Sequence, residues 1–206
     1  MKIETELKFP VAGFKAAADR LNQMGAEASP WYFEKNIVLD DKDGSLRNKD
    51  CLLRLRQGLK NKLTLKLPPV YQDKTGIAKT KQEYETCLDN IEDMEHILVH
   101  LGYQIWLRYE KFRQVWKLPD VKVCLDILPF GRFVEIEGSE KSIMQVSESI
   151  GLDMKTATAQ TYHELNQACI KDQKLHPTDD FVFDASRQKY ICRELNIHLS
   201  VDVPKE

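Results

Sequence analysis

The sequence predicts an α+β fold: an antiparallel sheet of about eight strands, closed or nearly closed into a barrel, with helices packed outside it. Short segments in which apolar and polar side chains alternate at period two predict the strands. Most of these segments follow one another through short turns, which favours antiparallel pairing. Because few long connections remain, the pattern favours a closed sheet over an open one.

The first strand is expected at the start of the chain. Within residues 3–9, three apolar side chains alternate with Glu4, Glu6 and Lys8. Residues 11–24 then place apolar side chains at three- and four-residue spacing and stop at Gly25. That pattern predicts an amphipathic helix.

The remaining elements follow from the same two patterns. Further strands are predicted at residues 31–40, 51–57, 61–67, 79–87, 105–118, 121–128 and 132–137. Further helices are predicted at residues 90–100, 139–150 and 161–171. Residues 40–44 are rich in aspartate but lack the spacing of a calcium-binding loop, so a plain loop is expected there.

The composition of the end of the chain differs from the rest. Pro177, Asp179 and Asp180 accompany a drop in apolar density. This predicts a boundary between a domain at residues 1–171 and a C-terminal extension at 172–206. Helical spacing at residues 185–195 predicts that the extension is partly helical, and leaves open whether it is a lid or a docked tail.

Composition excludes several classes of protein. The chain has 206 residues and a formal net charge of -2, which argues against a strongly basic nucleic-acid binder. Its five cysteines are widely spaced and include no C-x-x-C pair, as expected for reduced thiols in the cytoplasm. No apolar run approaches the ~18 residues of a membrane span. We therefore expect a cytoplasmic protein without nucleic-acid or membrane partners, and leave a homodimer open.

The most informative pattern is the charge on one face of nearly every predicted strand. Apolar residues occupy the opposite faces, so helices packed there would turn the charged faces into the barrel. Inward charges are tolerated only where the interior is wet and the charges compensate one another or bind a ligand. The set comprises six cations and seven acids: Glu4, Glu6, Lys8, Arg54, Arg56, Lys66, Glu83, Glu85, Lys111, Arg113, Asp126, Glu135 and Glu137.

Such a lining suits polyphosphate chemistry. Arg and Lys from several strands can hold phosphate oxygens. Neighbouring carboxylates would repel that anion unless Mg²⁺ or Mn²⁺ lay between acid and phosphate. A surface salt-bridge ladder between Arg54, Arg56, Glu83 and Glu85 is the alternative for that pair of strands. The repetition over six or more strands favours the lined interior.

Several charged segments also resemble a known family. Glu4-Thr5-Glu6-Leu7-Lys8 is similar to the E-x-E-x-K signature of the CYTH superfamily, the triphosphate tunnel metalloenzymes. That superfamily includes class IV adenylate cyclases, thiamine triphosphatases and inorganic triphosphatases. Residues 53–56, 64–66, 111–113, 125–137 and 161–165 resemble its later motifs in the same order.

The resemblance implies an eight-stranded antiparallel tunnel and a role for each charged residue. Lys111 would help to activate or orient the nucleophile, and Glu83 and Glu85 would support the network. The triphosphate would be held by Lys8, Arg54, Arg56, Lys66 and Arg113. One or two divalent ions would be bound by Glu4, Glu6, Asp126, Glu135 and Glu137.

The expected function is divalent-metal-dependent hydrolysis of a triphosphate-containing small molecule: inorganic triphosphate, thiamine triphosphate or a nucleoside triphosphate. The alternative is a class IV adenylate cyclase, although the His-Phe pair found near the start of some cyclases has no clear counterpart here. A non-catalytic polyphosphate- or nucleotide-binding module is the second alternative, and the intact set of acids argues against it.

Overall fold

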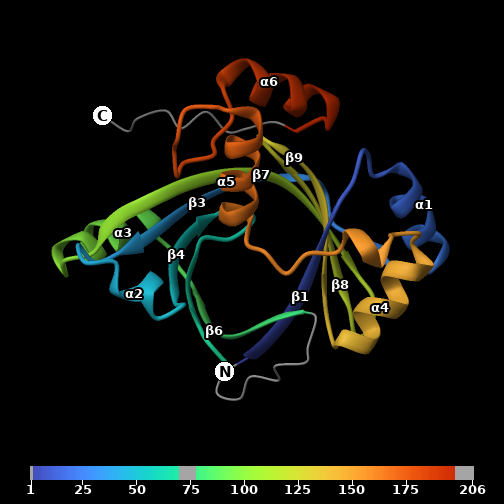
Figure 1. Cartoon of the computed structure of the whole chain (residues 1–206), viewed down its shortest axis with the longest axis horizontal. Coiled ribbons are helices and arrows are strands. Elements are labelled where there is room, and N and C mark those ends of the chain that lie inside the picture. The colour runs from blue at the N-terminus through green and yellow to red at the C-terminus, as the bar shows by residue number, and fades with distance from the viewer. Residues whose placement is uncertain (1, 70–77, 198–206) are drawn as a thin grey trace.

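The computed structural model describes residues 2–69 and 78–197 (Figure 1). Its strands are β1 (Lys2–Pro10), β2 (Glu27–Ala28), β3 (Tyr32–Asp40), β4 (Leu52–Gln57), β5 (Lys62–Leu67), β6 (Lys79–Cys87), β7 (Gln104–Lys117), β8 (Lys122–Leu128) and β9 (Gly131–Glu137). Its helices are α1 (Lys15–Gln23), α2 (Ser45–Asn48), α3 (Ile91–His100), α4 (Glu140–Ser149), α5 (Tyr162–Gln173) and α6 (Ala185–Glu194), with a short 3-10 helix at Met154–Thr156.

Eight of these strands form a closed antiparallel barrel. Their order is β7-β3-β4-β5-β6-β1-β9-β8, and β8 returns to pair with β7. The two-residue strand β2 adds to the edge of β7 outside this ring. The predicted α+β class and closed eight-stranded sheet are therefore confirmed.

The apolar core lies between the outer face of the barrel and the helices. Leu7 and Phe9 of β1 pack in one cluster with Ala17 and Leu21 of α1 and with residues of α4. A second cluster joins β3 and β4 to α3, and the three helices flank opposite sides of the ring in Figure 1. Because the apolar side chains face outward, the alternating partners in each strand face the interior.

Besides the unpredicted strand β2 and the 3-10 helix, the start of the first helix and the loop after β3 differ from the sequence prediction. The first helix begins at Lys15 rather than at residue 11, because the Val11 N–H continues the sheet by donating to the Arg132 carbonyl at 3.0 Å. The aspartate-rich loop continues into α2, which the sequence did not predict. The Asp40 carboxylate organises this turn by accepting the N–H groups of Leu46 at 2.9 Å and Arg47 at 3.1 Å.

Asp40→Asn is expected to lower the free energy of unfolding at pH 7 by about 1–3 kcal/mol, since hydrogen bonds to an ionised acceptor are lost. Burial favours the neutral acid, but these N–H groups and the Arg47 side chain lower the pKa of Asp40 overall. A lowered pKa contributes stability above the ordinary carboxyl value, about 3.9, and this contribution is lost as pH falls through the folded-state pKa. Urea unfolding at pH 7 and in acid checks both the size and the sign.

The exposed Asp43 of the same loop is the matched control, because its carboxylate makes no hydrogen bond among the described residues. Asp43→Asn should leave stability within about 0.5 kcal/mol of wild type. An Asp40→Asn deficit that did not shrink in acid would contradict the electrostatic account.

The described part of the C-terminal extension packs on the barrel. The bounds of helix α6 agree with the predicted helix at 185–195 to within one residue. Its Ile191 packs with Phe183, Phe112 and Ile127. The last nine residues of the predicted extension, 198–206, lie outside the described residues. The division into 1–171 and 172–206 stays a prediction. No helix in the described ranges is long and apolar enough to cross a bilayer.

Candidate active site

A cavity of about 450 Å³ occupies the interior of the barrel. Its described lining carries eleven Lys and Arg side chains and eight carboxylates, so cations are in excess. Of the thirteen candidate site residues, Asp126 alone is absent from the lining. The other twelve line it: Glu4, Glu6, Lys8, Arg54, Arg56, Lys66, Glu83, Glu85, Lys111, Arg113, Glu135 and Glu137.

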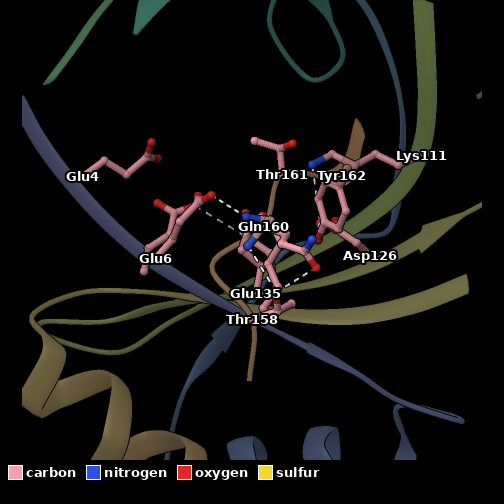
Figure 2. Close-up of polar contacts among 12 residues, drawn as sticks. Glu4, Glu6, Lys111, Asp126, Glu135, Thr158, Gln160, Thr161 and Tyr162 are labelled. Carbon is pink, nitrogen blue, oxygen red and sulfur yellow. Dashed lines mark hydrogen bonds and ion pairs between the residues drawn. The ribbon is translucent and has the colours of Figure 1, made fainter. Parts of the chain in front are cut away.

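Strand β1 supplies two acids and one cation to this cavity. Figure 2 shows Glu4 and Glu6 reaching inward from β1, with Lys111 across from them. Glu4 forms an ion pair with Lys66, and Lys66 also lies 3.7 Å from Glu83. Burial favours the neutral form of Glu4, but the Lys66 ammonium lowers its pKa to about 2. Glu4 is therefore an anion at neutral pH.

Lys8 connects β1 to β9. Its ammonium pairs with Glu6 and lies 3.6 Å from Glu135. Glu135 is buried, which favours the neutral acid, yet Arg113 and Lys8 lower its pKa well below the ordinary value. The two strands thus present fixed charges of both signs to the same space.

Arg113 and Asp126 form a buried bidentate pair. The Arg113 Nε and Nη2 donate to the two Asp126 oxygens at 2.6 and 2.5 Å, and Nη2 also donates to Glu135 at 2.7 Å. The Tyr162 hydroxyl donates to Asp126 at 2.7 Å, and the Lys111 Nζ lies 3.4 Å away. Asp126 is fully buried behind the wall, so the metal-ligand role predicted for it stays a prediction.

Arg54 differs from the other cations of the lining. Its Nη1 donates to the Tyr109 hydroxyl at 2.9 Å, but its Nε and Nη2 have no acceptor among the described residues. The side chain is only 6% exposed, and no described carboxylate forms an ion pair with it. Because a buried cation is normally paired, this guanidinium is prepared to receive an anion.

Glu34 of β3 contacts the site but was not among the thirteen candidate residues. Its carboxylate lies 3.4 Å from Arg56 Nε and 3.6 Å from Lys111 Nζ, and its other oxygen is buried without a hydrogen bond. Burial opposes ionisation, but Lys111 and Arg56 hold the pKa of Glu34 well below its usual range. The alternation of Glu34 with Asn36 was a usable signal, obscured by the charged Lys35 on the opposite face of the strand.

Five cations of the described lining were also missing from the candidate set: Arg47, Lys62, Lys79, Lys81 and Lys122. Lys62 pairs with Glu85. Lys122 pairs with Glu137 at 2.5 Å, and Lys81 pairs with Asp50. Lys79 precedes Lys81 on the same face of β6. The period-two rule that located Glu83, Glu85 and Asp126 extends directly to the four lysines, so their signal was present in the sequence.

Carboxylates gather where a divalent ion could bind. The described residues contain two groups with ligand atoms within 4.8 Å of one another: Glu4, Glu6 and Glu137, and Cys124, Glu135 and Glu137. Burial raises the pKa of Glu137; Lys122 opposes this, and the neighbouring Glu135 and Glu4 add to it. Hard oxygen ligands held together against their mutual repulsion fit Mg²⁺ or Mn²⁺.

Comparison with known proteins gives a consistent picture. A family model described as the CYTH domain matches residues 2–162. A Methanocaldococcus jannaschii protein that carries adenylate cyclase as a provisional name is 29% identical over 148 residues, covering 71% of this chain and 81% of that protein.

Two solved structures share the architecture. A provisionally named adenylate cyclase from Vibrio parahaemolyticus has a TM-score of 0.70 at 18% identity, covering 81% of this chain and 98% of that one. A provisionally named adenylyl cyclase from Hippeastrum, described as having a dominant triphosphatase activity, has a TM-score of 0.53 at 14% identity, covering 98% and 99%. At these identities the likeness establishes the fold, whereas the family model spans most of the sequence. The chain belongs to the CYTH family.

Proposed function

We propose that this protein hydrolyses a triphosphate with the help of Mg²⁺ or Mn²⁺ inside its barrel. One observation carries the proposal: the same cavity contains both the Arg54 guanidinium, with its unsatisfied donors, and the carboxylate group of Glu4, Glu6 and Glu137. An anionic substrate satisfies the first feature and a divalent cation the second. The triphosphatase activity described for the Hippeastrum relative supports hydrolysis.

Different cations of the lining would bind the phosphate groups from different sides of the barrel. Arg54 donates two free N–H positions to phosphate oxygens, and Arg56 and Lys66 add charge from the same side of the barrel. Lys8 adds a positive charge on the other side of the barrel, between Glu6 of β1 and Glu135 of β9. Arg113 is fixed by Asp126, so it presents its remaining Nη1 with little freedom to move.

The acids divide into ligands and supports. Glu4, Glu6, Glu135 and Glu137 would hold the metal, which when bound supplies positive charge opposite the phosphate oxygens. Glu83 and Glu85 hold Lys66 and Lys62 in place. Lys111, lying between Glu34 and Asp126, orients the attacking water. The water oxygen bonds to phosphorus as the phosphorus–oxygen bond to the leaving phosphate breaks, and the water proton passes to the leaving phosphate or to solvent.

Class IV adenylate cyclase is the second candidate, and one feature favours the nucleotide substrate that it needs. The cavity lining includes apolar side chains from one end of the barrel, among them Val38, Leu52, Trp106 and Leu107. Inorganic triphosphate would leave this surface uncovered, whereas the nucleoside of ATP would contact it, both in a cyclase and in a nucleoside triphosphatase. A panel of tripolyphosphate, thiamine triphosphate and ATP, assayed for phosphate release and for cyclic AMP, decides between the two.

Turnover is expected to disappear in excess EDTA and to return when Mg²⁺ or Mn²⁺ is restored, because the carboxylate group repels the substrate unless a cation intervenes. Phosphate release measured across a metal titration checks this. Calcium, which prefers more ligands at longer distances, serves as the comparison ion. Full turnover in EDTA would contradict the metal role, and binding of tripolyphosphate without any turnover would indicate the non-catalytic module.

A further inference from the structure

The wall of the barrel is incomplete beside the first half of β7. Strand β8 pairs with β7 only from Phe112 to Lys117, so residues 104–111 have no β8 partner on that side. The C-terminal extension fills the gap, in the region where its segment runs along β7 towards α6 in Figure 1. The Phe181 N–H donates to the Arg108 carbonyl, and the Glu110 N–H donates to the Phe181 carbonyl, both at 3.1 Å.

Side chains reinforce this attachment. The Arg108 N–H donates to Asp180 Oδ1 at 2.6 Å, and the Phe183 N–H donates to Glu110 Oε2 at 3.0 Å. Four hydrogen bonds therefore hold the segment against β7. None of these extension residues lies within the part of the chain that matches the CYTH model.

Phe181 turns its ring towards the cavity. It is 4% exposed, lines the cavity and stacks on Tyr109 with ring centroids 4.9 Å apart and planes 20° apart. Phe130 supports it edge-on at 5.6 Å. The hydroxyl of that same Tyr109 accepts the hydrogen bond from Arg54 Nη1. A continuous series of contacts thus runs from the extension to the unsatisfied guanidinium.

We propose that Phe181 is a positioning residue for Arg54, acting through the Tyr109 ring, so that the C-terminal extension sets the geometry of the anion site. The inference rests on the proposed function, since it takes Arg54 to hold the triphosphate. The Tyr109 hydroxyl is the one hydrogen-bond acceptor that the described residues give to Arg54. An arginine side chain is long and flexible, so its free donors keep one direction only if that acceptor is fixed.

Phe183 provides a matched control two residues away. It is also a buried phenylalanine of the extension, at 8% exposure, but it packs outside the barrel against Phe33 and Phe112 and does not line the cavity. Removing either ring weakens the packing of the extension on the barrel. Of the two rings, only that of Phe181 stacks on Tyr109. The two variants therefore separate positioning from general stability.

The test measures kcat/KM with Mg²⁺ for tripolyphosphate and for ATP. Phe181→Ala and Tyr109→Phe should each lower it about tenfold, as expected when a charge-assisted contact loses its alignment. Phe183→Ala should keep kcat/KM within about twofold of wild type, even if its unfolding midpoint falls as much as that of Phe181→Ala. Adding Phe181→Ala to Arg54→Ala should cause no further loss beyond about twofold, because both changes act on one contact.

The outcomes are distinguishable. Equal losses in Phe181→Ala and Phe183→Ala, or additive losses in the double variant, would overturn the positioning role. Wild-type activity in Tyr109→Phe would do the same, and this variant keeps the ring stack and the fold even if Phe181→Ala does not fold. A large loss in Arg54→Ala with none in Phe181→Ala refutes this inference alone, whereas full activity in Arg54→Ala refutes the proposed function beneath it.

Discussion

Arg54→Ala is expected to lower kcat/KM for the triphosphate substrate by roughly ten- to a hundredfold. A charge-assisted hydrogen bond from a buried guanidinium is worth about 1.5–3 kcal/mol, and Arg54 has free donors available for it. The concentration of Mg²⁺ or Mn²⁺ needed for half-maximal activity should stay close to wild type, because Arg54 touches none of the clustered carboxylates. Steady-state kinetics over a metal titration measures both quantities.

Two comparison variants distinguish loss of a phosphate contact from loss of a metal ligand and from loss of a surface charge. Glu137→Gln keeps the shape of the side chain but removes an anionic ligand, so it should raise the metal requirement. Arg20→Ala removes an exposed guanidinium on α1, outside the barrel, and should change neither quantity. Identical metal dependence in Glu137→Gln and wild type would show that the charged lining is structural.

The second large effect is on stability. Arg113→Ala should lower the free energy of unfolding by about 3–5 kcal/mol, because it removes the bidentate partner of a buried carboxylate and leaves it only Tyr162 and the more distant Lys111. Asp126 is fully buried and Arg113 is 4% exposed, so the two short hydrogen bonds are largely shielded from water in the folded protein. Equilibrium unfolding in urea, with the slope checked for a single transition, gives the value.

Arg113→Lys tests the geometry of the pair. Lysine keeps the charge but lacks the planar fork, so we expect an intermediate loss. The exposed Arg193 of α6 supplies a control whose replacement by alanine should fall within about 0.5 kcal/mol of wild type. A loss below about 1 kcal/mol in Arg113→Ala would mean that Tyr162, Lys111 or water compensates Asp126 once the guanidinium is removed.

The sequence was sufficient to predict the barrel and the direction of its charged faces. Both follow from alternation alone: Leu53 and Leu55 lie outside, and Arg54 and Arg56 line the interior. Alternation assigns a face but not a depth. It could not show that Asp126 lies behind the cavity wall, accepting hydrogen bonds from its neighbours.

Other features depend on which strands and segments lie side by side, which a local pattern does not record even where, as at Glu34, it indicates the face. Glu34 belongs to the site because β3 lies between β4 and β7, next to Arg56 and Lys111. Phe181 is placed at the cavity by an isolated β-bridge to Tyr109 of β7, and it does not belong to a segment with helical or strand periodicity. Such contacts between distant segments are set by the whole fold, so sequence reasoning found the strands but missed these two residues.

The position of β1 between β6 and β9 has a kinetic consequence. Strand β1 cannot complete its pairing until Glu137 and its neighbours in β9, more than a hundred residues later in the chain, have been synthesised. Pairing across so long a loop is slow, and it makes closure of the ring a late event on the folding pathway. Since β1 carries Glu4, Glu6 and Lys8, a chain that stalls before closure also lacks three of the charged groups of its cavity. Recovery of metal-dependent turnover after dilution from urea should therefore follow the slowest structural phase of refolding.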